Sequence, residues 1–331
     1  MNAVIVSFER MPLGLLGCYG SQHVQTPSFD QLATESIVFD QHFGENFDPQ
    51  AAQQAWWTGE YHFPRSGDQQ VASTNIFETF PNRDIEMHLL DFNASESGED
   101  GLRAAQTIFD GWNASTDTQH LLGIQCTGTQ LGASTEWDVG VEQCAKQVVA
   151  CDAVLQSILA QVAALSCEPP LLIVTAAAGE ILFTRDSSTD AEQESLLHEE
   201  RVHVPLIVRV PGSDQQGSRR QTLTQAIDIA PTLADWFDIQ FNESERTGKS
   251  LLLLIDGRAT ALRERIFMGH AATQAVRDAD FCLIRSESAP PQLFLKPEDR
   301  YEQADAAREY PDVVDAMESA LDEFLAGFGS P

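Results

Sequence analysis

Apolar and polar positions follow two different patterns along this chain. Up to about residue 257, short apolar runs typical of buried strands lie at residues 3–8, 120–126, 171–175 and 204–208, with a weaker strand pattern at 84–90. Between them, amphipathic stretches predict helices at residues 29–35, 102–112, 137–165 and 224–237. This order predicts an α/β fold with a central, mostly parallel sheet sandwiched by helices, and we expect the runs at 171–175 and 204–208 to be parallel strands.

The spacing of the apolar segments changes after Gly257. Four short apolar segments follow closely on one another, at residues 266–269, 275–277, 281–285 and 292–295, as in an antiparallel meander. A last helix is predicted at residues 312–328, with Val313, Met317, Leu321 and Leu325 on one side. The sequence therefore predicts an α/β domain at residues 1–257 and a smaller C-terminal subdomain of antiparallel strands and one helix at residues 258–331.

The chain is strongly acidic. It has 50 Asp and Glu against 20 Lys and Arg, which gives a formal net charge of −30. Nucleic acids and anionic membranes are bound through basic surfaces, because their phosphates must be neutralised. We therefore expect neither as a partner. The sequence leaves a protein partner, a small-molecule partner and a homo-oligomer open, and it leaves open whether the acidity reflects a saline habitat.

Three further observations concern the compartment. No apolar run reaches the roughly 18 residues of a membrane-spanning helix, and the first residues lack the basic start of a signal peptide. The six cysteines have no metal-binding spacing, and we expect all six to be buried as small hydrophobic residues. Together these features predict a soluble, cytoplasmic protein.

Several blocks of residues occur in a characteristic order. The strand at residues 2–8 is followed by Glu9-Arg10, then by Gly17-Cys18-Tyr19-Gly20, then by Thr26-Pro27-Ser28-Phe29-Asp30. Later blocks are Trp57-Thr58-Gly59-Glu60-Tyr61, the strand ending in Gly179-Glu180, residues 199–212, and Ile227-Asp228-Ile229-Ala230-Pro231-Thr232. In this order the blocks resemble the sulfatases of the alkaline phosphatase superfamily. Residues 264–296 resemble the C-terminal subdomain of that family, and only residues 65–120 have no counterpart.

The resemblance implies a nucleophile position that this chain does not fill. Active sulfatases carry an oxidised cysteine or a serine nine residues before the threonine of the Thr-Gly pair, and an arginine four residues after that nucleophile. Counting back from Thr58 places Pro49 and Gln53 at these positions. Proline has no nucleophilic side chain. A register shifted by two residues places Phe47 there, which is no better.

The resemblance also implies a divalent cation held by about four oxygen ligands, and these positions are degenerate too. Glu9 and Arg10 occupy the places of two aspartates, and Ala177 and Ala178 occupy the places of an Asp-His or Asp-Asn pair. One carboxylate cannot hold a hard cation alone, and Arg10 carries the wrong charge. We therefore expect no metal and no other cofactor.

Six residues remain as candidates for a residual pocket near the implied site: Glu9, Arg10, Asp48, Glu180, His203 and His270. All of them except Arg10 can be read as acids and bases of a rebuilt site, but ion pairing and ordinary structural hydrogen bonds are the stronger explanation for each. Trp56 and Trp57 can be read as an aromatic floor for a ligand or as core residues that fill vacated volume, and we favour the second reading.

These losses make a pseudoenzyme the leading hypothesis for function: a sulfatase-like scaffold that serves binding, regulation or assembly. The alternative is a hydrolase of sulfate or phosphate esters that uses a rebuilt, metal-free site. A structural homo-oligomer is a third hypothesis. The run Thr247-Gly248-Lys249-Ser250 resembles the end of a phosphate-binding loop, but it lacks the required upstream glycine, because residue 243 is Glu.

Overall fold

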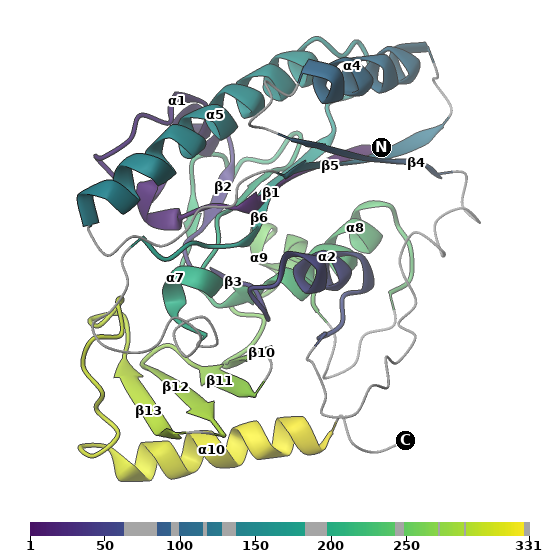
Figure 1. Cartoon of the computed structure of the whole chain (residues 1–331). Helices are drawn as coiled ribbons and strands as arrows, with labels where there is room; N and C mark the ends of the chain where they lie inside the picture. Colours follow the sequence, from purple (N-terminus) through teal and green to yellow (C-terminus); the bar gives the residue numbers. More distant parts are fainter. Residues whose placement is uncertain are drawn as a thin grey trace.

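A seven-stranded sheet forms the centre of the computed structural model, in the order β4-β5-β1-β6-β7-β2-β8 (Figure 1). The structure describes residues 1–62, 85–93, 99–114, 118–127, 137–182, 197–241, 248–270, 272–287 and 289–327. Its strands are β1 (Asn2–Arg10), β2 (Ile37–Phe39), β4 (Ile85–Asn93), β5 (Gln119–Thr127), β6 (Leu171–Ala178), β7 (Leu206–Arg209) and β8 (Arg219–Arg220). Asp84 and Phe328, the outer ends of a predicted strand and a predicted helix, lie outside the described residues.

The strand directions confirm the prediction of a mostly parallel sheet, with one exception. β4, β5, β1 and β6 pair in parallel, whereas β7 is antiparallel to both β6 and β2. The prediction of a parallel strand at residues 204–208 is therefore wrong. A continuous apolar run reports that both faces of a strand are buried, and it contains no information about the direction in which the strand runs.

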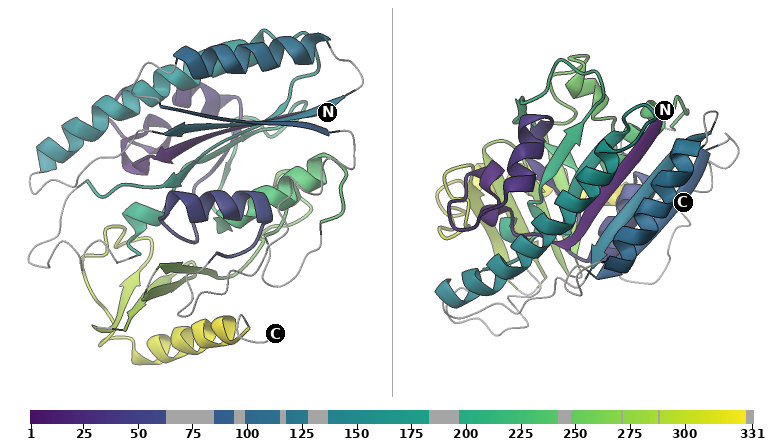
Figure 2. Two further views of the ribbon diagram at one scale, coloured as in Figure 1. Left: turned by 45° about the vertical axis from the view of Figure 1, so that its right-hand side comes forward. Right: turned by 90° about the horizontal axis from the view of Figure 1, so that it is seen from above.

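Helices cover both faces of the sheet (Figures 1 and 2). On one face lie α1 (Pro27–Thr34), α4 (Glu99–Ala114) and α5 (Trp137–Ala163), and on the other lie α2 (Pro49–Thr58), α8 (Ile229–Trp236) and α9 (Leu252–Ile255). The alternation of strand side chains explains these two layers. In β1, Val4, Val6 and Phe8 belong to the first core, whereas Ala3 and Ile5 belong to the second.

Two sequence predictions need correction at the level of single elements. The helix expected at residues 224–237 begins only at Ile229, because Thr224–Gln225 form β9, which pairs with β3 (His42–Phe43), and Ala226–Asp228 form a 3-10 turn. The expectation that all six cysteines are buried holds for four of them. Cys18 and Cys167 are half-buried.

The C-terminal part is a four-stranded antiparallel sheet with one helix, as predicted. Its strands are β10 (Ile266–His270), β11 (Thr273–Arg277), β12 (Phe281–Ser286) and β13 (Ala289–Leu295), followed by α10 (Pro311–Ala326). One face packs against α10 through Val276, Leu283 and Leu293. The other face shares a hydrophobic cluster with the end of β6 and with α7 (Glu199–Val202). In the described part of the chain, no helix combines the length and apolarity needed to cross a membrane.

Candidate functional site

The residues implied by the resemblance meet at the carboxyl ends of β1 and β6. These neighbouring parallel strands end at the same edge of the sheet, where α/β folds usually bind ligands. Arg10 lies opposite Ala178 in the pairing register, and the amide of Met11 donates to the carbonyl oxygen of Ala178 at 2.9 Å. Glu9, Arg10, Ala177 and Ala178 therefore lie close together, as the sequence comparison required.

Ala177 and Ala178 point into hydrophobic surroundings on opposite faces of β6. Ala177 is 1% exposed and belongs to the cluster that contains Ala52, Ala55 and Trp56 of α2. Ala178 is fully buried in the cluster that contains Phe43, Phe47 and Val202. The family resemblance implies metal ligands at these two positions of β6, but each carries an apolar side chain within a packed core.

An ion pair occupies the adjacent space. Arg10 Nη1 lies 3.7 Å from Glu180 Oε2, and both side chains are largely buried. Burial raises the pKa of Glu180, while the positive charges of Arg10 and Arg201 act in the opposite direction. The strand ends thus carry a carboxylate that is compensated by arginine.

The start of α2 gives Asp48 and Pro49 a structural role. The Asp48 side chain accepts hydrogen bonds from the backbone amides of Gln50 and Ala51, at 2.9 and 3.0 Å, and so caps the helix. Pro49 follows as the first helical residue, where its fixed φ and missing N–H are tolerated. Gln53, one turn further on, is half-buried. The nucleophile position is therefore the first turn of a capped helix.

The two tryptophans of α2 differ in burial. Trp56 is 1% exposed and packs in the same cluster as Ala177. Trp57 is half-buried beside that cluster, and its ring lies against Gly123 of β5. Trp56 therefore fills core volume, in line with the interpretation favoured from the sequence.

Both histidines of the candidate set make structural contacts. His203 uses both ring nitrogens: Nδ1 lies 3.1 Å from Glu199 Oε1, and Nε2 lies 2.8 Å from the carbonyl oxygen of Asp40. His270 Nδ1 lies 2.8 Å from Asn46 Oδ1, and its ring packs 4.0 Å from that of Phe47. Burial lowers the pKa of His270, which keeps its ring neutral near pH 7.

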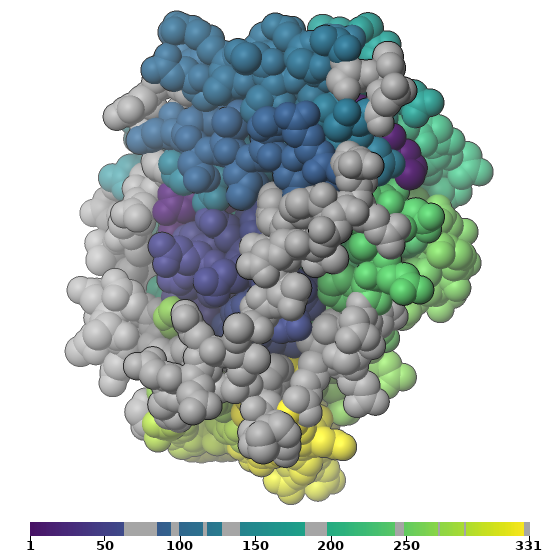
Figure 3. Space-filling model, turned by 90° about the vertical axis from the view of Figure 1, so that its right-hand side faces the viewer, coloured from purple at the N-terminus to yellow at the C-terminus, as the bar shows by residue number. Residues whose placement is uncertain are grey.

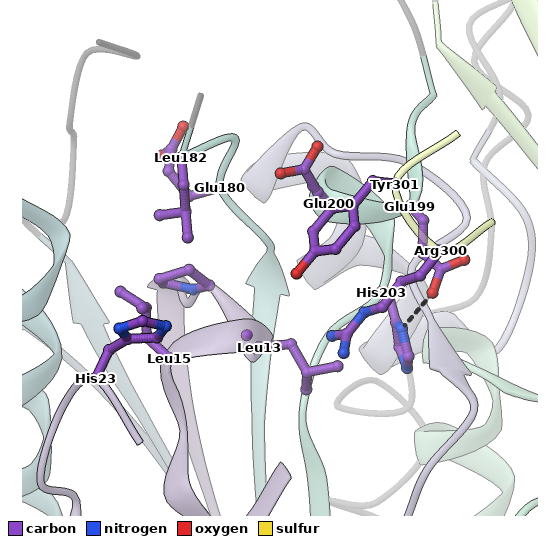
Figure 4. Close-up of a pocket in the computed structure, with 12 residues that line it drawn as sticks. Leu13, Leu15, His23, Glu180, Leu182, Glu199, Glu200, His203, Arg300 and Tyr301 are labelled. Carbon is purple, nitrogen blue, oxygen red and sulfur yellow. Dashed lines mark hydrogen bonds and ion pairs between the residues drawn. The ribbon is translucent and has the colours of Figure 1, made fainter. Parts of the chain in front are cut away.

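A small cavity of about 70 Å³ adjoins the strand ends (Figure 4). Glu180 and His203 contribute to its wall, together with His23, Glu200 and Tyr301. Figure 4 shows His203 turned toward Glu199 and the Tyr301 ring reaching toward the cavity. The structure thus divides the candidate residues. Glu180 and His203 line this cavity, whereas Asp48 and His270 do not.

The side chains present do not fit the divalent cation that the family resemblance implies. Of the four expected ligand positions, two are buried alanines without donor atoms and one is an arginine. Among the described residues, no group of three or more His, Cys, Asp or Glu is arranged to hold a metal ion. No catalytic step can therefore be derived through such an ion at this place.

Sequence reasoning missed a buried ionic cluster beside the cavity. Lys296 Nζ lies 2.9 Å from both Glu199 Oε2 and Glu302 Oε1, and Arg277 Nη1 lies 2.7 Å from Glu199 Oε2. His198 Nδ1 adds a contact of 2.7 Å to Glu302. The available signal was Lys296 itself, one of only three lysines, placed directly after a predicted apolar strand.

Comparison with known proteins agrees with this architecture. A family model described as Sulfatase matches residues 58–239, and one described as N-sulphoglucosamine sulphohydrolase, C-terminal, matches residues 193–305. The first match covers more than half of the chain, and the chain belongs to the sulfatase family. No curated protein sequence matches it.

Solved structures show the same fold at low sequence identity. A phosphonate monoester hydrolase of Agrobacterium radiobacter is 14% identical, with a TM-score of 0.77 over 98% of this chain and 95% of that one. A 2-O GAG sulfatase is also 14% identical, with a TM-score of 0.75 over 98% of this chain and 92% of the other. These similarities confirm the fold of the alkaline phosphatase superfamily, including the C-terminal antiparallel sheet.

Proposed function

We propose that this sulfatase-family protein does not carry out metal-dependent hydrolysis of sulfate esters and acts instead by binding. The observation that carries the proposal is the replacement of two expected metal-ligand positions by Ala177 and Ala178, each buried in a hydrophobic cluster. Function has to be argued from the site and not from the fold, which many activities share.

The physical argument concerns charge at the reacting centre. In a metal-dependent ester hydrolase, the cation activates the nucleophile and neutralises charge on the ester oxygens. Here Pro49 offers no nucleophile, and the Arg10–Glu180 ion pair lies beside the strand ends. Neither requirement of the family chemistry is met by the side chains at these positions.

Metal binding gives the first test. After dialysis against calcium, elemental analysis is expected to find no ion bound at a stoichiometry of one per chain. One ion per chain that is lost in Glu9→Ala would overturn the proposal.

Rescue of activity gives the second test. The double variant Pro49→Ser with Gln53→Arg restores only the nucleophile and its arginine, and we expect it to show no aryl-sulfatase activity. The matched variant adds Arg10→Asp, Ala177→Asp and Ala178→His, the minimum further change that can return ligands for a cation. Turnover by the wild type, or by the double variant alone, would contradict the proposal.

One observation favours the alternative, a hydrolase with a metal-free site. Glu180 lines the cavity of about 70 Å³, and burial raises its pKa, as expected of a general acid. Two of the other candidates have structural roles: Asp48 caps a helix, and His203 makes two hydrogen bonds. A screen of aryl sulfates and aryl phosphates tests this alternative. Turnover that is abolished by Glu180→Gln would establish it over the binding function.

A cytoplasmic location and a protein or small-molecule partner form the remaining part of this proposal. The strong negative charge supports both a soluble protein and the exclusion of nucleic acid as a partner. Cell fractionation with an antibody tests the location, and recovery in an extracellular fraction would refute it.

A further inference from the structure

A second cavity, of about 530 Å³, lies at the far end of α2 from the strand-end site. Because α2 has ten residues, its two ends are about 15 Å apart. Seven described residues line the cavity: Tyr61, Lys249, Arg263, Glu264, Arg265, Phe267 and Phe324. They come from the segment after α2, the segment before α9, β10 with its approach, and α10. In the face of the molecule drawn in Figure 3, α10 (yellow) lies at the bottom and α4 (blue) lies at the top.

One part of the lining is aromatic. The rings of Phe267 and Phe324 are stacked, with centroids 3.9 Å apart and planes at 4°. Tyr61 meets Phe324 edge-on at 4.9 Å, and its hydroxyl donates to Gln225 Oε1 at 2.5 Å. Phe267 and Phe324 already stack on each other, and Tyr61 stands nearly perpendicular to Phe324, so the three rings form an angular aromatic surface against which the ring of a ligand can pack.

The other part of the lining carries positive charge. Arg263 is neutralised by Asp228, whereas Lys249 Nζ donates to the carbonyl oxygen of Leu262 at 2.9 Å. Arg265 is exposed. Among the described residues, neither Lys249 nor Arg265 has a carboxylate within ion-pair distance. Glu264, which is also exposed in the lining, offsets one of these two charges, so the described lining keeps a local excess of positive charge in a chain with a net charge of −30.

The buried carboxylate of Asp228 fixes this wall. It accepts hydrogen bonds from the guanidinium of Arg263 at 2.5 and 2.6 Å and from the backbone amide of Lys249 at 2.8 Å. Gly248 lies so close to the 3-10 turn between β9 and α8 that an added Cβ would be 1.9 Å from the carbonyl oxygen of Ile227. The segment that presents Lys249 is therefore held rigidly, which reduces the ordering cost of binding a ligand.

We propose that this cavity binds a small anion that carries a planar aromatic ring. The ring would pack against the aromatic surface, and the anionic group would meet Lys249 and Arg265. The volume lies in the range of about 300–1,000 Å³ that is usual for small-molecule sites. The proposal does not depend on the absence of sulfatase activity, because the cavity lies at the other end of α2 from Pro49.

Calorimetric titration with naphthalene-1-sulfonate at low ionic strength tests this proposal. The sulfonate cannot be hydrolysed as an ester, so the result is independent of any turnover. We expect one molecule to bind per chain, and binding to weaken at higher salt. Neutral 1-naphthol is expected to bind at least about tenfold more weakly, because it lacks the charge that the cations recognise.

Two variants with the same change in charge locate the site. Arg265→Glu is expected to weaken binding about tenfold or more, because it replaces attraction by repulsion. Arg308→Glu is the control: Arg308 is also exposed, but it lies outside the cavity lining. Phe324→Ala tests the aromatic surface and is expected to weaken binding too, with folding checked by circular dichroism. Absence of binding at millimolar sulfonate, or equal effects of the two arginine variants, would overturn the proposal.

Discussion

Replacement of Lys296 by methionine should strongly destabilise the protein. The Lys296 side chain is fully buried, and its ammonium group lies 2.9 Å from each of two carboxylates, on Glu199 and Glu302. Both carboxylates are themselves at least nine-tenths buried. Methionine has a similar volume but no charge, so the variant leaves two buried carboxylates without one of their cations. Removing one partner from a buried ion pair costs about 3–5 kcal/mol, and we expect a loss of that size.

The expected loss of stability in Lys296→Met follows from the burial of the charges rather than from the ion pair itself. An exposed ion pair in the same chain provides a matched control. Lys146 lies 3.0 Å from Glu142 on the surface of α5, and both side chains are more than 70% exposed. Solvent screens such a pair, so Lys146→Met should change the free energy of unfolding by less than about 1 kcal/mol. Urea unfolding followed by circular dichroism measures both variants. Equal unfolding midpoints for Lys296→Met and Lys146→Met would refute the reasoning.

The loss of stability at acid pH gives a second measurement on Lys296→Met. Burial raises the pKa of Glu199, but the hydrogen bond with His203 and the charges of Arg277 and Lys296 outweigh this and hold the pKa below its ordinary value. A carboxylate with a lowered pKa stabilises the fold above its unfolded pKa, about 4.5, and this contribution is lost as the pH falls. Without Lys296 the pKa of Glu199 is less depressed, so Glu199 contributes less stability above that pH. The less stable variant should therefore unfold at a higher pH than the wild type as acid is added.

Three further substitutions test other parts of the structure. Trp56→Ala should lower the free energy of unfolding by about 3–5 kcal/mol, because it opens a cavity in the core beside α2. Trp57→Ala should lower it by less, because Trp57 is only half-buried, and equal losses for the two variants would contradict this. Neither carboxylate oxygen of the fully buried Glu45 has a hydrogen-bond partner among the residues that the structure describes, and burial raises its pKa to about 8. Wild-type stability should therefore fall as the pH rises from about 4.5 to 8, and Glu45→Gln should remove this slope and gain on the order of 3 kcal/mol at pH 7; parallel pH profiles would refute it. Asp48→Ala should lose about 0.5–2 kcal/mol as a helix cap, and a stability equal to that of the wild type would show that the cap is unimportant.

The order of elements was predictable from the sequence because each strand and helix has its own period. β1, β5, β6 and α5 all lie within a few residues of their predicted bounds, as does the C-terminal meander. The direction of β7 was not predictable, since it depends on where the chain re-enters the sheet. β2 and β3 were also missed, because runs of three and two residues are too short to show a period.

The candidate site was predictable only in part. The resemblance placed Arg10 and Ala178 together correctly, because both positions are fixed by the strands that carry them. It did not reveal that Glu180 pairs with Arg10, that Asp48 caps α2, or that both nitrogens of His203 are occupied. Such contacts depend on side-chain directions and on residues distant in sequence, for which the chain offers no local pattern.

The cluster that joins the C-terminal sheet to the end of β6 has a consequence for synthesis on the ribosome. Ala178, Phe47 and Val202 are covered by Ile266, Met268 and Phe294, which are translated later. Until β13 has left the exit tunnel, the nascent chain exposes this apolar surface, and transiently exposed apolar surface promotes aggregation. Truncation after residue 257 should therefore give an aggregating fragment rather than a smaller folded protein.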